Sequence, residues 1–315
     1  AMIPTRPMAV VALGGHALLP KGEKPTVAGQ FRACQRAMRH MLVLFRRGWD
    51  VVLTHGNGPQ VGNILLRSEI AAKKAYPIPL SVAVAESGGE IGYIIQQSLH
   101  NELRRSRLPH AVVTVLTQVL VDLNDPAFHM PTKPIGPFYT ERQTGPLRKR
   151  GVPLAFADGY GWRRVVASPR PLRIVEADTV RRLAAQDVVV IAAGGGGIPV
   201  VERGGRLEGV DAVIDKDLAS ACLAVTLRAK LFIMLTDVRK AALWYNTPRQ
   251  KDIDRMTAAQ ARRYLAEGHF PPGSMGPKVE AAADFAERTG CPALITTPEA
   301  LKAALEERDG TRIVP

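Results

Sequence analysis

Apolar runs of strand length alternate with amphipathic stretches of helical period along most of the chain. Residues 8–13 are wholly apolar, and residues 50–54 carry a similar run. Between them, residues 27–45 place apolar side chains three and four positions apart, which is the spacing of one face of an α-helix. Strand–helix–strand units of this kind predict a mainly parallel sheet covered by helices.

The same alternation continues on both sides of an irregular middle region. By this pattern we expect further helices at residues 61–75, 80–105, 176–186, 215–227, 257–266, 277–288 and 298–307. We expect further strands at residues 111–121, 188–192, 231–235 and 293–296, and a small hairpin around residues 203–206. The whole pattern predicts an α/β fold.

The middle region, residues 122–171, has a different character. Prolines and glycines interrupt nearly every run, and only residues 154–157 and 162–166 resemble strands. A long irregular segment inside a compact domain is typical of a functional insertion. We therefore expect one domain over residues 1–315, with residues 122–171 inserted as a small protruding lid between the two halves of the sheet.

The net charge of the chain does not by itself indicate a class of partner. The chain has 42 Lys and Arg against 29 Asp and Glu, a net charge of +13. Basic clusters such as residues 104–107 and 148–150 have acidic residues between them, and no zinc-finger spacing, RNP-type strand or basic heptad helix is present. We interpret the excess as solvated surface and expect no nucleic-acid partner.

Apolar runs, the first residues and the cysteines together predict the cellular compartment. No apolar run approaches the roughly 20 residues that span a bilayer, and the first residues do not resemble a signal peptide. Cys34, Cys222 and Cys291 lie far apart without metal-ligand spacing, so we interpret them as small buried apolar residues. We therefore expect a cytoplasmic protein with no membrane partner and no metal site of its own.

Glycines follow three of the expected strands at their carboxyl ends. They are Gly14 and Gly15, then Gly56 and Gly58 with Asn57 between them, and then Gly194, Gly195 and Gly196. Ligands of open α/β sheets bind at this edge, and glycine lets backbone N–H groups approach an anion. The pattern predicts a phosphate or carboxylate site. Neither the GxxxxGKS/T nor the GxGxxG pattern is present, which argues against P-loop and nicotinamide enzymes.

Three lysines have distinctive neighbours. Lys216 lies between two aspartates where a helix is expected to begin, and Lys278 follows a glycine-rich segment that enters another helix. Lys133 lies between prolines in the expected lid. Phosphoryl transfer requires positive charge on the transferring oxygens, so these lysines are candidate catalytic residues.

Taken together, these segments resemble the carbamate kinases of the amino-acid kinase superfamily over essentially the whole chain. The matching runs are residues 10–15, 54–63, 131–138, 161–166, 194–201, 213–217 and 268–278. The resemblance implies a three-layer α/β/α sandwich, a homodimer, and reversible formation of carbamoyl phosphate from carbamate and ATP. It also implies Mg²⁺ bound through the nucleotide phosphates, and a place at the end of a fermentative pathway such as arginine degradation.

The resemblance also implies roles for individual residues. The implied catalytic residues are Lys133, Lys216 and Lys278. The residues implied to bind the acid and its phosphate are Gly14, Gly15, His16, Gly56, Asn57, Gly58, Gly194, Gly195 and Gly196. The residues implied to bind the nucleotide, ATP or ADP, are Asp215, Lys216, Asp237, Tyr245, Met275 and Lys278. Carbamate is already an anion, so no general base is needed, and alignment with charge neutralisation suffices.

The sequence departs from the family pattern at three places. His16 stands where an asparagine is usual, and Arg239-Lys240 stands where an acidic or small residue is usual. Where the family has a glutamine followed by glycine, residues 85–93 of this chain read AESGGEIGY. His16 could donate to a phosphoryl oxygen as asparagine does, or it could mark a different acid with Gly88 opening room for it.

Three hypotheses therefore remain open. The chain is a carbamate kinase, a divergent kinase of another small carboxylate, phosphonate or phosphate, or a catalytically weak binding or sensor protein of the same fold. Retention of all three lysines argues against the last, because a binding protein has no need of them together.

Overall fold

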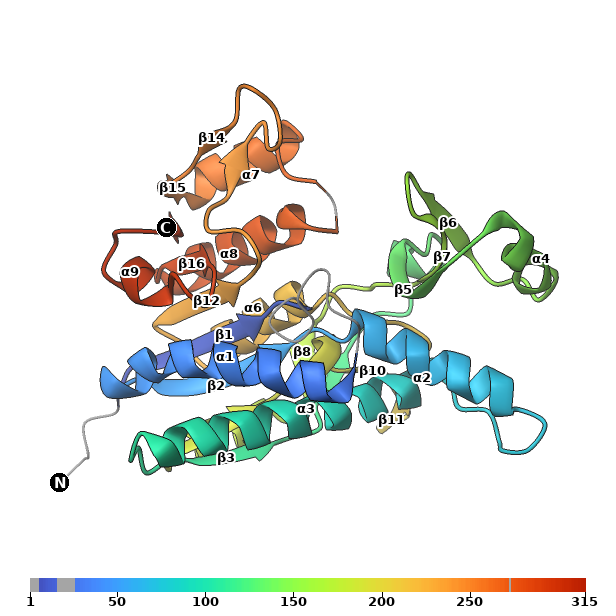
Figure 1. Cartoon of the computed structure of the whole chain (residues 1–315), viewed down its shortest axis with the longest axis horizontal. Coiled ribbons are helices and arrows are strands. Elements are labelled where there is room, and N and C mark those ends of the chain that lie inside the picture. The colour runs from blue at the N-terminus through green and yellow to red at the C-terminus, as the bar shows by residue number, and fades with distance from the viewer. Residues whose placement is uncertain (1–5, 16–25, 272) are drawn as a thin grey trace.

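An eight-stranded sheet forms the centre of the molecule (Figure 1). The computed structural model describes residues 6–15, 26–271 and 273–315. The strand order is β15-β17-β16-β12-β1-β2-β9-β3, and every neighbouring pair is parallel except β16 and β17. The strands are β1 (Met8–Leu13), β2 (Asp50–His55), β3 (Ala111–Thr114), β9 (Val188–Ile191), β12 (Leu231–Leu235), β15 (Arg255–Thr257), β16 (Ala293–Thr296) and β17 (Thr311–Val314).

Helices cover both faces of this sheet. One face packs against α1 (Val27–Arg46), α3 (Leu80–Arg105) and α9 (Leu301–Leu305). The other packs against α5 (Ala177–Ala184), α6 (Lys216–Thr226), α7 (Ala258–Ala266) and α8 (Met275–Thr289). Along β1, Val10 and Ala12 point to the second core while Ala9, Val11 and Leu13 point to the first, because side chains alternate across a strand. The expected α/β/α sandwich is confirmed.

A second sheet of four strands corrects one expectation. Its order is β11-β10-β4-β8, with β4 (Gln118–Leu120), β8 (Arg173–Ile174), β10 (Ile198–Arg203) and β11 (Arg206–Gly209). The single strand expected at residues 111–121 is wrong, because its two ends lie in different sheets. Thr117 stabilises the bend: its hydroxyl donates to Val115 O at 2.8 Å and accepts from Ala193 N at 2.9 Å. The expected hairpin is confirmed by the pairing of β10 with β11.

A small lobe stands apart from the main sheet (Figure 1). It contains β5 (Lys133–Tyr139), α4 (Glu141–Lys149), β6 (Leu154–Ala157) and β7 (Gly161–Val166). The two expected short strands are confirmed, but α4 was not expected, because Gly145 and Pro146 are usual helix breakers. A capping box between Thr140 and Gln143 satisfies its first turn. Use of this lobe as a lid over the site stays a prediction.

Strand β5 attaches the small lobe to α2 (Gly58–Ala71). The contact is so close that a Cβ on Gly62 would lie 1.9 Å from the Cα of Gly136. Beside it, Ile135 is fully buried against apolar side chains of α2 and α3. Arg164 of β7 adds a hydrogen bond of 2.7 Å to Glu69 of α2. This packing holds the start of β5, where Lys133 lies, beside the main sheet.

The remaining described elements are short. They are β13 (Ala242–Leu243), β14 (Lys251–Asp252) and the 3₁₀ turns η2 (Pro126–Phe128) and η3 (Gly194–Gly196). No helix in the described ranges is both long enough and apolar enough to cross a membrane.

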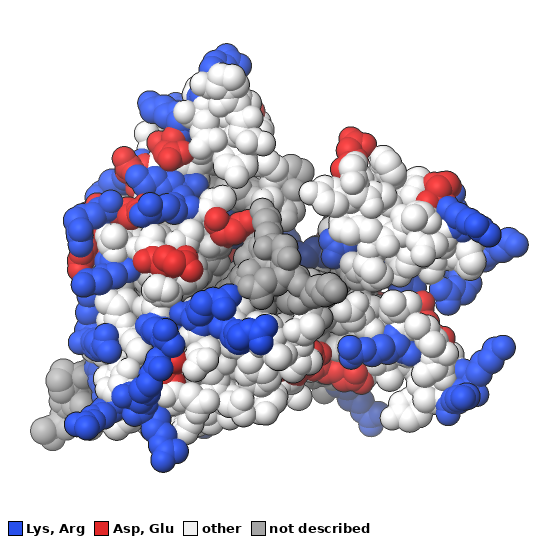
Figure 2. All heavy atoms as spheres, in the orientation of Figure 1, with Lys and Arg blue, Asp and Glu red and all other residues white. Residues whose placement is uncertain are grey.

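Basic side chains are spread over the left edge of the main body in Figure 2. Many arginines pair with acidic residues, as Arg47 does with Glu306 at 2.7 Å and Arg181 with Asp178 at 2.7 Å. The same view shows a hollow between the main body and the small lobe at the right.

Candidate active site

Two adjoining pockets lie at the carboxyl edge of the central strands. The inner pocket, about 330 Å³, is lined by Gly15, Gly56, Asn57, Gly58, Pro59, Gln60, Lys133, Ile135, Gly195, Val213, Ile214, Asp215, Lys216, Asp217, Gly273 and Lys278. The outer pocket, about 190 Å³, is lined by Thr236, Asp237, Val238, Lys240, Ala242, Tyr245, Phe270, Pro271, Ser274, Met275 and Lys278. Lys278 lines both. Its ammonium lies 3.0 Å from Asp217 of the inner pocket and 3.4 Å from the carbonyl oxygen of Ser274 of the outer pocket, where the two pockets meet.

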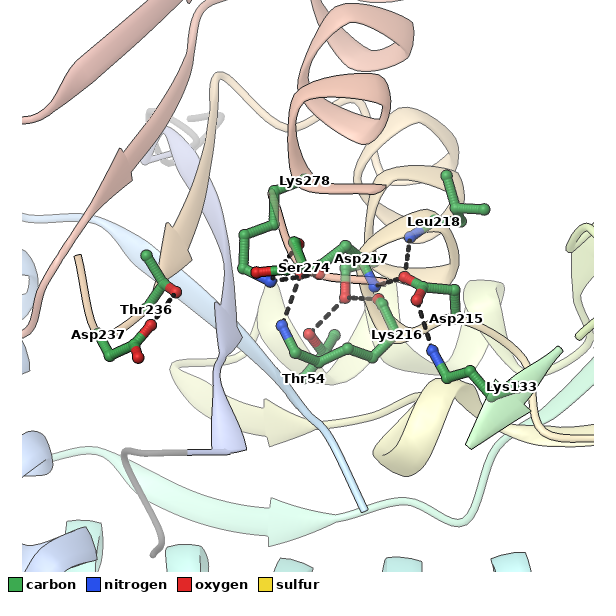
Figure 3. Close-up of polar contacts among 11 residues, drawn as sticks. Thr54, Lys133, Asp215, Lys216, Asp217, Leu218, Thr236, Asp237, Ser274 and Lys278 are labelled. Carbon is green, nitrogen blue, oxygen red and sulfur yellow. Dashed lines mark hydrogen bonds and ion pairs between the residues drawn. The ribbon is translucent and has the colours of Figure 1, made fainter. Parts of the chain in front are cut away.

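The carboxylate of Asp217 lies between two lysine ammonium groups (Figure 3). Its Oδ1 is 2.6 Å from Nζ of Lys216, and its Oδ2 is 3.0 Å from Nζ of Lys278. Lys216 and Asp217 begin α6, whereas Lys278 lies in the first turn of α8, so the contact between these two helices brings the three charges together.

Burial and pairing act in opposite directions on these charges. Burial alone would raise the pKa of Asp217, but the two adjacent ammonium groups hold it far below its usual range. Burial lowers the pKa of Lys216 despite its ion pair with Asp217. Burial also opposes the charge of Lys278, yet attraction to Asp217 raises its pKa above the usual value. The cluster therefore presents two ammonium groups against one carboxylate, a net positive charge suited to an anion.

Asp215 connects the helix start to the small lobe. As the N-cap of α6, it accepts at Oδ1 from the backbone N–H of Asp217 at 2.9 Å, which satisfies a free helix donor. Its other oxygen, Oδ2, lies 2.5 Å from Nζ of Lys133 on β5. One carboxylate thus caps α6 and holds a lysine of the small lobe at the pocket.

The glycine turn after β9 needs glycine for its backbone. Gly195, Gly196 and Gly197 have φ angles of 67°, 90° and 82°, a run that other residues rarely adopt. A Cβ on Gly195 would lie 2.1 Å from Nδ2 of Asn57. That amide donates to the buried hydroxyl of Ser87 on α3 at 2.9 Å. The turn, α2 and α3 thereby pack together behind the inner pocket.

The structure gathers most of the residues expected to bind the acid. Gly15, Gly56, Asn57, Gly58 and Gly195 all line the inner pocket together with the three lysines.

Three other glycines expected there do not line the inner pocket. Gly14 donates its N–H to Leu235 O at 2.8 Å and so connects β1 to β12. Gly194 packs against His55, and Gly196 packs against the carbonyl of Ile214. His16 lies outside the described residues.

The residues expected to bind nucleotide divide between the pockets. Asp237, Tyr245 and Met275 line the outer pocket with Lys278. Asp215 and Lys216 line the inner pocket instead.

Several lining residues were not among the sequence candidates. The sequence identified Asp217 only as an acidic neighbour of Lys216 and predicted no role for it in the site. Lys240 follows β12 and lines the outer pocket, where it also pairs with Asp254. Gln60 lies in the first turn of α2. Its position just after the glycine pair was the available signal.

Gly88 lies away from the inner pocket. It lines a separate cavity of about 10 Å³ with His55, Leu116, Thr117 and Gly194. A Cβ on Gly88 would meet Leu116 at 3.7 Å. The absence of a side chain at this position therefore adds no room beside the lysine cluster.

Comparison with known proteins is unambiguous. The model of the amino acid kinase family matches residues 7–297. The carbamate kinase of Pyrococcus furiosus is 47% identical over 310 residues, covering 97% of this chain and 98% of the relative. The carbamate kinase-like protein YahI of Escherichia coli is 47% identical over 312 residues, covering 98% of each. The solved carbamate kinase from Giardia lamblia bound to AMP-PNP superposes with a TM-score of 0.92 at 41% identity, covering 99% of each chain.

Proposed function

The chain belongs to the amino acid kinase family, and from this premise we propose that it is a carbamate kinase, transferring the γ-phosphoryl group of ATP reversibly to carbamate. Its relatives over nearly the full length carry that name. The observation that carries the proposal is Lys278, whose ammonium lies at the junction of the two pockets. A phosphoryl group passing from a nucleotide in the outer pocket to an acid in the inner pocket would cross this point.

The lysines supply the electrostatic part of the reaction. An oxygen of carbamate attacks the γ-phosphorus, the bond to the β–γ bridging oxygen breaks, and ADP leaves with that electron pair. Lys216 and Lys278 offset the negative charge on the transferring oxygens, and Lys133 adds positive charge from the small lobe. Two anions can thereby approach each other within bonding distance.

No proton transfer is required of the protein. Carbamate is an anion before it attacks, so alignment and charge neutralisation account for catalysis. The carboxylates that line the inner pocket in the described residues, Asp215 and Asp217, are both paired with lysines. They orient those lysines rather than accept a proton from the substrate.

Mg²⁺ is compatible with this site as a companion of the nucleotide. The described residues contain no group of three or more ligating side chains that could hold a metal ion. Phosphate oxygens of ATP in the outer pocket would hold the ion, and Asp237 is the carboxylate among the described residues that line that pocket. When bound, Mg²⁺ supplies further neutralisation of phosphate charge.

Further properties are proposed on the family resemblance. The enzyme acts as a homodimer in the cytoplasm, and it serves the end of a fermentative pathway such as arginine degradation, where it forms ATP from carbamoyl phosphate and ADP.

A coupled assay tests the function. Purified protein with ADP, Mg²⁺ and carbamoyl phosphate should form ATP, and ATP with carbamate should form ADP. A panel of other small acids with ATP serves as the comparison. Turnover of another acid at a higher kcat/KM than carbamate would favour the second hypothesis, a divergent kinase. Binding of nucleotide with no turnover of any acid would favour the binding protein.

A further inference from the structure

His55 ends β2 directly behind the inner pocket and is completely buried. Its Nδ1 lies 3.0 Å from the carbonyl oxygen of Gly56. Its Nε2 has no hydrogen-bond partner among the described residues and faces a small cavity that it shares with Gly194 and Thr117. The two ring nitrogens therefore have different surroundings.

These surroundings determine the proton's position on the ring. A carbonyl oxygen can only accept, so Nδ1 must carry the hydrogen for its contact with Gly56 to be a hydrogen bond. Nε2 then holds a lone pair, and a lone pair facing a cavity costs less than a buried N–H without an acceptor. Lys216 lies close enough to disfavour a second proton on the ring. A neutral imidazole with hydrogen on Nδ1 follows.

The hydrogen bond orients the next peptide group. The Gly56–Asn57 peptide is trans and planar, so the N–H of Asn57 points opposite to the Gly56 carbonyl. The carbonyl faces His55, whereas Gly56 and Asn57 line the inner pocket and His55 does not. The N–H of Asn57 donates to no acceptor within the described part of the chain. Because Gly56 and Asn57 line the inner pocket, this N–H is available to a ligand bound there.

We propose that His55 is a positioning residue that turns the Gly56 carbonyl away from the inner pocket and so presents the Asn57 N–H to the bound anion. Without this hydrogen bond the peptide can rotate and place a carbonyl oxygen, which repels an acid or phosphate, at the same point. The inference deepens the proposed function, because it depends on an anion in that pocket but not on which acid is used.

Two substitutions separate positioning from packing. The side-chain nitrogen of asparagine can occupy the place of Nδ1, so His55→Asn keeps the donor, whereas His55→Leu keeps a similar volume without it. With ADP and carbamoyl phosphate, we expect His55→Leu to lower kcat about 10- to 100-fold, somewhat less than loss of a direct oxyanion donor. The KM for ADP should stay within about twofold, and His55→Asn should recover most of the lost kcat. Equal losses in folded His55→Asn and His55→Leu would overturn the proposal.

A spectroscopic measurement on the unsubstituted enzyme gives an answer even if His55→Leu fails to fold. In ¹⁵N-histidine-labelled full-length protein, with His55→Asn used only to assign its signals, the shifts should report a neutral ring protonated on Nδ1 at pH 7. Hydrogen on Nε2 would overturn the inference, because Nδ1 could not then donate to Gly56. Failure of the wild-type enzyme to use carbamoyl phosphate would count against the proposed function and would leave this tautomer test intact.

Discussion

The ammonium of Lys278 lies 3.0 Å from the carboxylate of Asp217, although 61 positions separate the two residues along the chain. The pair joins the start of α8 to the start of α6 and places one lysine at the junction of the two pockets. Asp217 also holds Lys216 at 2.6 Å. The spacing of the two candidate catalytic lysines therefore depends on a single buried carboxylate.

Removal of either lysine should impair turnover strongly. We expect Lys216→Ala and Lys278→Ala each to lower kcat by about 10²–10³, the usual effect of losing one oriented donor to a developing charge. Steady-state kinetics with ADP and carbamoyl phosphate measure the loss, and circular dichroism checks the fold. Lys302→Ala, on the exposed side of α9, is the matched control. Near-normal turnover in both folded site variants would contradict their assignment.

Asp217→Asn should change stability and the alkaline limb of the pH profile together. Leaving two buried lysines without their carboxylate should lower the free energy of unfolding by about 3–5 kcal/mol. Asp217 raises the pKa of Lys216 against the effect of burial, so its loss lowers that pKa and the ammonium charge disappears at a lower pH. The decrease of kcat with rising pH should therefore begin at a lower pH than in the wild type.

An exposed carboxylate serves as the control for that experiment. Asp178 is 81% exposed and pairs with Arg181 on α5. Asp178→Asn should change stability by less than about 1 kcal/mol, the range of surface pairs. Comparable loss in the two variants would mean that the lysine cluster does not depend on Asp217.

Burial of His55 should make the folded protein sensitive to acid. Burial lowers the pKa of His55 to about 4 from an ordinary value of 6.5, with the nearby charge of Lys216 acting in the same direction. The unfolded chain then takes up a proton near pH 6.5, while the folded chain does not until about pH 4. Stability is therefore lost as pH falls through this window, by up to about 3 kcal/mol.

Urea unfolding at several pH values tests whether the free energy of unfolding decreases as pH falls. The free energy of unfolding of the wild type should fall more steeply between pH 6.5 and 4 than that of His55→Asn, which lacks the titrating ring. Parallel pH dependences would show that His55 is not the responsible group.

Gly62→Ala should disturb the small lobe. A Cβ at this position has no room against Gly136, so β5 must move away from α2 and carry Lys133 away from Asp215. We expect a loss of about 1–3 kcal/mol in stability, as for other overpacked contacts, and a lower kcat. Gly145→Ala in α4 is the control, since a Cβ there meets no neighbour. Equal kcat in the two variants would contradict a catalytic role for this contact.

Hydrogen exchange tests whether the small lobe closes over the site. If residues 122–171 act as a lid, amides of β5, β6 and β7 should exchange more slowly with AMP-PNP and carbamate together than with either alone, because closure would bury them. Peptides from the central strands should change little. Unaltered exchange in the lobe at saturating ligand would argue that it is a fixed wall of the site.

Much of the fold could be predicted because it depends on local patterns. The period of apolar positions identified α3 to its last residue and β1 at both ends. Glycines at strand ends predicted the edge of the sheet where the inner pocket lies. In the turn after β9 they are needed for the backbone itself, because few other residues accept the positive φ of Gly195, Gly196 and Gly197. The unexpected α4 shows the limit of such rules, since its cap and packing outweigh the breaking effect of Gly145 and Pro146.

Contacts between distant segments were decided only by the tertiary structure. The segment 111–121, rich in valine and leucine, did not reveal that β3 and β4 belong to different sheets. Nor did the sequence show that Asp217 pairs with Lys278, or that the Nδ1 of His55 meets the Gly56 carbonyl inside a closed core. The apolar face of a helix depends on residues three and four positions apart, and the sequence gives the identity of these residues directly. The strength of a charge pair and the pKa of a buried ring depend instead on distance and burial, and these exist only once helices from different parts of the chain have packed together.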